Sequence, residues 1–378
     1  MTKNILAIAI AAAVMAPSAF AAATVYGVAH VGMAQQSDVS NGATIAGTGT
    51  GTAAAAGSVT NVLSNSSRLG IKGSEDLGAG LKAVYQMEMA VNMDGETGSS
   101  DPFGTGLRNT FAGIGGGFGT VLMGRHDSPI KMVGRSYDLF GDQIGNNRNL
   151  LGGGANGAYT TLVDGRHSNV LAYATPTMGG FSGLLAYVPG AGRSNEYMSN
   201  DVTNTTTGAN TSNASTVKQD AWSAMAGYKA GAFGASLGYI NVDKLNGTDA
   251  FTATRLGAEY TFGAAKVVAL YQNAKIVDSQ DSYGLGGSYK VGAAGTVKAQ
   301  YYVASDVKSG KIGANMITVG YDHALSKSTT AYVAYAAVDN DTNGRFTANM
   351  SNGGSGDNTT AIAGKDNSAF SVGLIHNF

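Results

Sequence analysis

The chain of 378 residues has no cysteine, one tryptophan and five prolines, and only 13% of its residues are charged. The lack of cysteine excludes a disulfide framework, so the fold must be stabilised in another way. The formal net charge of −1 gives no electrostatic basis for binding nucleic acid. After residue 21, no apolar run approaches the roughly 18 residues of a transmembrane helix, which excludes membrane-spanning helices.

Glycine and tyrosine are abundant instead, with 56 and 18 residues, a balance typical of a turn-rich all-β chain. Segments of alternating polarity recur along the chain, separated alternately by short glycine-bearing turns and long polar loops. This pattern predicts a 16-stranded antiparallel transmembrane β-barrel, whose long outer loops include about 36–66, 92–106 and 128–165. A closed barrel leaves no strand edge unpaired, which would stabilise a chain without disulfides.

The beginning of the chain indicates export. Lys3 precedes an apolar run over 5–16, and Ala19-Phe20-Ala21 has the small-residue pattern of a cleavage site. We therefore expect a secretory signal peptide over 1–21. Its cleavage would leave 22–378 as a single barrel domain.

The last ten residues, 369–378, alternate between an apolar face and a smaller, more polar one. The apolar face consists of Phe370, Val372, Leu374, His376 and Phe378. An alternation with a period of two residues, continued over ten residues, has the pattern and the length of a tilted strand that crosses a bilayer. A last strand with a terminal phenylalanine is typical of outer-membrane β-barrels, although an ordinary strand at the end of a soluble chain shares the alternation.

On the later strands, aromatic rings fall six residues apart on the face that also carries leucine, valine and alanine. These pairs are Phe181 with Tyr187, Trp222 with Tyr228, Phe233 with Tyr239, and Tyr283 with Tyr289. Six residues span roughly 20 Å along a strand, so we expect two rows of rings near the two membrane surfaces, in contact with outer-membrane lipid. A soluble sandwich would not repeatedly place aromatic residues at both ends of its strands.

The first five strands largely lack these rings, since their outward face is aliphatic and small. Such a surface indicates contact with protein instead of lipid headgroups. We therefore expect an oligomer interface that contains Val25, Ala29, Leu69, Ile71 and Met87.

Charged residues lie on the opposite face of the same strands, which should line the lumen. Sixteen strands enclose more space than side chains fill, so the lumen should hold water. We expect a basic wall at the pore constriction, made by Arg68, Lys72, Lys82, Arg108 and Arg166.

The loop over 128–165 is the candidate for narrowing the channel, because it is long and has a central Tyr137–Asp142 segment instead of a simple polar tip. Folded inward, Asp138 and Asp142 would face the wall arginines; left at the surface, they would only solvate the loop. Charged rings at constrictions are how pores select ions. The strands hold few acids and many more lysines and arginines, which indicates a mild anion preference.

The sequence predicts no catalytic residue, no metal site and no cofactor. His126, Asp127 and Ser128 are the residue types of a hydrolytic triad, but neighbours on an extended chain point to opposite faces. The five histidines lack the paired spacing of zinc ligands, and the glycines at 115–119 miss the spacing of a dinucleotide-binding loop.

Several stretches together resemble the general trimeric porins of Neisseria- and Burkholderia-type bacteria. They are SRLGIKGSEDLG at 67–78, RNTFAG at 108–113, GFGT at 117–120 and VGLIHNF at 372–378. The resemblance implies an outer-membrane homotrimer of a Gram-negative bacterium, with one pore per subunit for passive diffusion of ions and small hydrophilic solutes. It also implies an inward third outer loop, a second outer loop that latches onto a neighbouring subunit, and a cluster of wall arginines at Arg68, Arg108 and Arg166.

Two alternatives remain open at this point. A substrate-specific channel would share the same sequence pattern, because the difference lies in the shape of the constriction. An outer-membrane barrel enzyme would need a nucleophile or an acid pair at the rim, which the sequence does not supply.

Overall fold

A computed structural model of the chain describes residues 23–41, 57–95, 106–152, 163–189, 220–245, 249–275, 278–348, 354–355 and 359–378. The expected signal peptide over 1–21 lies outside these residues. None of the helices in the described part is long and apolar enough to cross a membrane.

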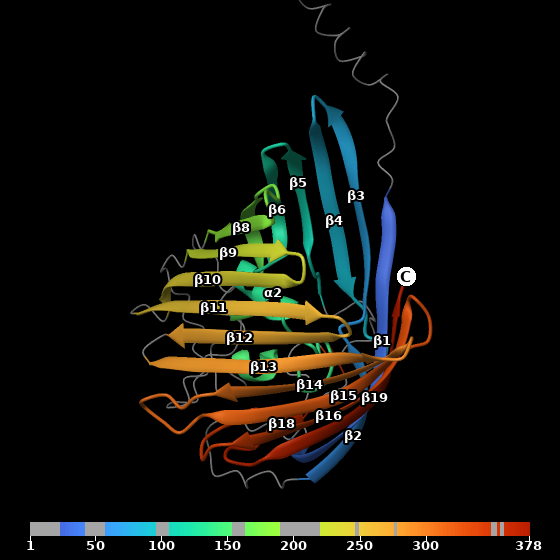
Figure 1. Ribbon diagram of the computed structural model, residues 1–378. Coiled ribbons are helices and arrows are strands. Elements are labelled where there is room, and N and C mark those ends of the chain that lie inside the picture. Colours follow the sequence, from blue (N-terminus) through green and yellow to red (C-terminus); the bar gives the residue numbers. More distant parts are fainter. Residues whose placement is uncertain are drawn as a thin grey trace, which may run out of the picture.

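Sixteen antiparallel strands form one closed barrel (Figure 1). They are β1 (Thr24–Asn41), β3 (Arg68–Gly78), β4 (Leu81–Ala90), β5 (Thr110–Gly116), β6 (Gly119–Asp127), β7 (Arg166–Ala174), β8 (Phe181–Val188), β9 (Ala221–Ala230), β10 (Phe233–Leu245), β11 (Asp249–Phe262), β12 (Ala265–Lys275), β13 (Ser279–Val291), β14 (Gly295–Ala304), β15 (Ala314–Ala324), β16 (Thr329–Asn340) and β19 (Asn367–Asn377). The first and last strands close the barrel, since β1 pairs with β19 from Val28 opposite Asn377 to Ser37 opposite Ser368. The predicted fold is confirmed.

The two faces of the strands differ as period two requires. Tyr283 and Tyr289 at the two ends of β13 are 50% and 57% exposed, and Trp222 on β9 is 46% exposed. In contrast, the inward Gln300 on β14 and Thr318 on β15 are buried. The predicted outward phase of the aromatic rings is therefore confirmed.

The first outer loop is shorter than the sequence predicted. β1 continues to Asn41, and an additional strand, β2 (Gly57–Asn65), pairs with its C-terminal half from Val31 opposite Ser64. At Ser66, whose φ is +57°, the chain bends from β2 into β3, which pairs with the N-terminal part of β1. The polar composition of β2 gave no strand signal in the sequence, and the strand forms because the backbone groups in the C-terminal half of β1 need hydrogen-bond partners.

The described part of the third outer loop contains the helices α2 (Pro129–Ser136) and α3 (Arg148–Leu151). α2 lies against β9, β10 and β11, and α3 lies against β13, β14 and β15. Two short strands, β17 (Gly354–Ser355) and β18 (Thr359–Ala361), belong to the eighth outer loop and pair with β2 and β1.

Candidate functional site

The third outer loop begins with a well-specified helix. Ser128 caps α2, since its hydroxyl accepts a hydrogen bond from the Lys131 amide at 3.3 Å, and Pro129 occupies the first turn. Ile130 and Val133 are fully buried. Gly238 on β10 makes room for this contact, because a Cβ there would lie 3.0 Å from the Ile130 Cα.

Beyond α2, the loop is hydrogen-bonded to inward side chains of the barrel wall. Gln300 and Thr318 both donate to the carbonyl oxygen of Gly145, each at 2.8 Å. Lys298 donates to the Leu139 carbonyl at 3.0 Å and to Gln143 Oε1 at 2.8 Å. These contacts hold the described part of the loop against wall residues of β14 and β15.

Asp142 lies between two arginines, one from the loop and one from the wall. The Arg135 guanidinium contacts both carboxylate oxygens, at 3.1 and 3.4 Å, and Arg68 Nη1 on β3 lies 3.5 Å from Oδ2. Burial alone would raise the pKa of Asp142, but Arg135 and Arg68 hold it below its usual range. Asp142 therefore stays ionised and joins the loop to the β3 wall.

The other two predicted wall arginines are paired as well. Arg108 Nε lies 2.6 Å from Glu88 Oε1, and Tyr26 donates to the second oxygen of Glu88 at 2.8 Å. Arg166 Nε lies 3.1 Å from Asp127 Oδ1. Each arginine is thus oriented by a carboxylate of a neighbouring strand, Glu88 on β4 or Asp127 on β6.

The loop and the wall together form a cluster with excess positive charge, which we call the loop–wall cluster. Three further contacts complete it. Lys131 lies 2.7 Å from Asp127, and Arg255 and Asp164 form a fully buried pair at 2.8 Å, which Arg148 approaches at 3.8 Å. Its cations are Arg68, Arg108, Lys131, Arg135, Arg148, Arg166 and Arg255. Its carboxylates are Glu88, Asp127, Asp142 and Asp164. Seven cations against four carboxylates leave an excess of three positive charges.

Asp138 has a different environment from Asp142. Its carboxylate accepts hydrogen bonds from the amides of Phe140 and Asn147, at 3.0 and 3.2 Å, and from the Gln300 side chain at 3.2 Å. Burial raises its pKa, and within the described chain no lysine or arginine forms an ion pair with it. The structure therefore places Asp138 in hydrogen bonds within the loop and to Gln300 of the β14 wall, away from the wall arginines.

The two predicted wall lysines lie outside the loop–wall cluster. Lys72 is exposed on β3, with Nζ 4.8 Å from the centre of the Tyr26 ring. Lys82 is exposed near the β3–β4 turn, at one end of β4. Arg68 pairs with Ala90, at the other end of the same strand. Eight strand positions separate Lys82 from Ala90, which is roughly 26 Å at the rise of a strand.

The predicted interface residues share one outward face. Val25, Ile71 and Met87 are direct neighbours across β1, β3 and β4, and they are 59%, 39% and 52% exposed. Leu69 on β3 and Ala29 on β1 are partly buried on the same strands. The result is a continuous apolar row across three strands.

Sequence reasoning missed most members of the loop–wall cluster, and three of them share a regular spacing. Asp127, Lys131 and Arg135 follow one another at a spacing of four residues, which places them on one side of a helix that starts at Ser128-Pro129. This spacing, together with the Ser-Pro start signal, was the available indication. The prediction treated the segment as an irregular loop and overlooked it.

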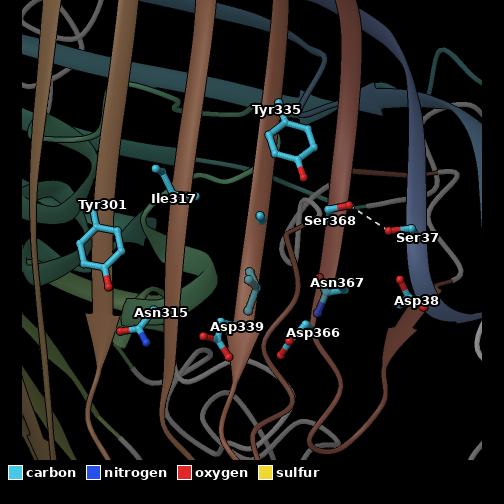
Figure 2. Close-up of a pocket in the computed structure, with 12 residues that line it drawn as sticks. Ser37, Asp38, Tyr301, Asn315, Ile317, Tyr335, Asp339, Asp366, Asn367 and Ser368 are labelled. Carbon is cyan, nitrogen blue, oxygen red and sulfur yellow. Dashed lines mark hydrogen bonds between the residues drawn. The ribbon is translucent and has the colours of Figure 1, made fainter.

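One cavity, of about 460 Å³, lies away from the loop–wall cluster. Figure 2 shows Tyr301, Ile317 and Tyr335 on the near side of the strands, with the loop helices behind them. These three side chains are 43% to 49% exposed and lie on the outward face of the strands, where the two tyrosines belong to the aromatic row. The cavity is therefore a hollow of the outer surface near the loop end and not part of the lumen.

A closed barrel with an apolar outer face, exposed aromatic rows and charges on its inner wall defines a membrane channel. Comparison with known proteins identifies the family, since residues 7–343 match the family model of Gram-negative porins. The chain belongs to this family. It is accordingly an outer-membrane protein of a Gram-negative bacterium, and a channel instead of an enzyme.

Similar proteins cover nearly the whole chain. Outer membrane porin protein 32 of Delftia acidovorans is 31% identical over 363 residues, 90% of each chain. Major outer membrane protein P.IB of Neisseria meningitidis serogroup B is 28% identical over 355 residues, 88% of this chain and 92% of its own. Among solved structures, the anion-selective porin from Comamonas acidovorans superposes with a TM-score of 0.73 at 28% identity, covering 95% of this chain and 100% of its own.

Proposed function

We propose that this porin is a general diffusion channel for ions and small hydrophilic solutes, with a preference for anions. The observation that supports the preference most directly is the excess of three positive charges in the loop–wall cluster. Similarity to a porin that is described as anion-selective points in the same direction.

In this proposal the third outer loop narrows the lumen and sets the selectivity. The loop contributes the negative charge of Asp142, and the barrel wall contributes the positive charge of Arg68, which lies 3.5 Å from it. A passing anion meets Arg68, Arg108 and Arg166, whose side chains are 13% to 21% exposed. A hydrated path past fixed charges selects by sign and size without a dedicated binding pocket.

The proposal also includes a homotrimer that forms through β1, β3 and β4. The apolar row of Val25, Ile71 and Met87 supports it, because this part of the wall, apart from Tyr85, lacks the aromatic residues found on the later strands. We further propose that residues 1–21 are a signal peptide, which N-terminal sequencing of the protein from outer membranes would test.

The test of the proposed function is recording from single channels in planar bilayers with a tenfold KCl gradient. We expect steadily open steps and a reversal potential of the sign that shows chloride as the more permeant ion. A reversal potential of the opposite sign would overturn the anion preference. Small steps that one solute blocks at low concentration would instead indicate the alternative, a substrate-specific channel.

A further inference from the structure

We propose that the eighth outer loop locks the constriction loop in place, through one backbone hydrogen bond to Gly145. This inference rests on the proposed role of the third loop in narrowing the pore. The Gly145 amide donates to the Ala348 carbonyl at 2.7 Å, and Ala348 lies in the described part of the eighth loop, eight residues beyond the end of β16. The positioning residues are Asn340 and Asn367, at the outer ends of β16 and β19.

Gly145 is the residue where the third loop is held from two sides. Its carbonyl oxygen accepts from Gln300 and Thr318 on the wall, while its amide donates to the eighth loop. Its φ is +62°, and a Cβ there would lie 2.6 Å from the Ala336 Cβ. The site therefore requires glycine and fixes the backbone three residues after Asp142.

Two buried asparagines hold the eighth loop in the position from which it reaches Gly145. Asn340 exchanges two hydrogen bonds with the Phe346 backbone, at 2.9 and 3.0 Å. Asn367 donates to the Phe346 carbonyl at 2.9 Å and accepts from the Ala348 amide at 2.8 Å. Both asparagines are at most 7% exposed, so these amide groups are bonded away from water.

Apolar packing reinforces this arrangement. Phe346 is fully buried and Ala348 is 1% exposed, in the same cluster as Ile144, Leu150 and Leu151 of the third loop. These two residues of the eighth loop thus share a small hydrophobic core with the constriction loop. Movement of the eighth loop should therefore displace the third loop at the proposed constriction.

Asn367→Ala tests the lock, because it leaves the Ala348 amide buried without its acceptor. We expect hydrogen exchange of the 144–151 segment to rise about tenfold, the fold-change that corresponds to about 1.4 kcal/mol. Exchange in α2, which is held by other contacts, should stay unchanged. In bilayers the open-channel current should fluctuate between sublevels that the wild type does not visit.

Asn315→Ala is the matched control, since Asn315 lies at the same rim on β15 but is half-exposed on the outer face. Asn340→Ala removes the second clamp independently and should reproduce the effect if Asn367→Ala fails to assemble. Unchanged exchange of 144–151 in both variants overturns the lock. Faster exchange with a current like that of the control would support the lock and refute the proposed role of the third loop.

Discussion

Removal of the Asp142 carboxylate is the most direct perturbation of the proposed selectivity. Asp142→Asn keeps the shape of the side chain and raises the excess charge of the loop–wall cluster by one. Arg135 and Arg68 lose their shared counter-ion, which lies 3.1 and 3.5 Å from them. Both guanidiniums then act on passing ions without compensation.

The magnitude follows from Coulomb's law. A unit charge at 4 Å in water changes the energy of a monovalent ion by about 1 kcal/mol, with opposite sign for an anion and a cation. The two shifts together correspond to about thirtyfold in the anion-to-cation permeability ratio. Salt screens this effect within about 10 Å at 0.1 M, so recordings at lower salt should show a larger change. The assay is the reversal potential in a KCl gradient, compared between wild type and variant.

Asp281→Asn is a suitable control, because Asp281 lies at the outer end of β13 and is hydrogen-bonded to Tyr271 and Asn273. This variant loses one negative charge on the outward face of the barrel, outside the loop–wall cluster, so its permeability ratio should equal that of the wild type. An equal shift in both variants, or a shift towards cations in Asp142→Asn, would refute the assignment of Asp142 to the constriction.

Four further predictions concern the pH dependence of selectivity, stability in acid, loop packing and assembly. Burial lowers the pKa of Lys131 to about 7, against the opposing effect of Asp127, so the anion preference should weaken as pH rises from 6 to 8, and Lys131→Met should abolish that pH dependence of the reversal potential. The pKa of Asp142 is lower in the folded than in the unfolded protein, so its ionised carboxylate stabilises the fold above its unfolded pKa of about 3.9, and this stabilisation disappears as the pH falls through the folded pKa. The difference in Tm between wild type and Asp142→Asn should therefore shrink in acid. A difference that stays constant with pH would contradict this prediction. Gly257→Ala should displace the third loop and cost about 1–3 kcal/mol, because a Cβ there would collide with the Tyr137 ring. Gly287→Ala, with its nearest neighbour at 3.8 Å, should leave the denaturation midpoint unchanged. Met87→Cys, in a chain that has no other cysteine, should yield covalent oligomers with a short bis-maleimide, and Leu285→Cys on the opposite wall should not.

The sequence was sufficient for the barrel because each strand carries its own evidence. Period two assigns every residue to one face, so the outward position of Tyr283 and the inward position of Arg68 could be predicted from local pattern. The pattern gives the face of a residue but not its depth, and Lys82 was therefore placed with Arg68 although it lies near a turn. Counting from the Gly78–Gly80 turn would have separated them.

The loop could not be predicted in the same way, because its backbone is irregular. Asp138 and Asp142 lie four residues apart, but Asp142 has a φ of +58°, so no regular spacing relates the directions of their side chains. Their environments are set by distant residues, Gln300 for Asp138 and Arg68 for Asp142. Such long-range contacts leave no signal in the local sequence.

The position of the loop and the selectivity of the pore depend on the same contact. Asp142 compensates Arg68 only while the turn around Gly145 holds it against the β3 wall, and the Ala348 carbonyl is one of the three groups that fix this turn. A displaced loop would separate the two charges and leave Arg68 uncompensated. Release of the eighth loop should therefore increase the anion preference in the same current sublevels in which the conductance changes. If loop position and selectivity depended on different contacts, conductance and anion preference would change independently.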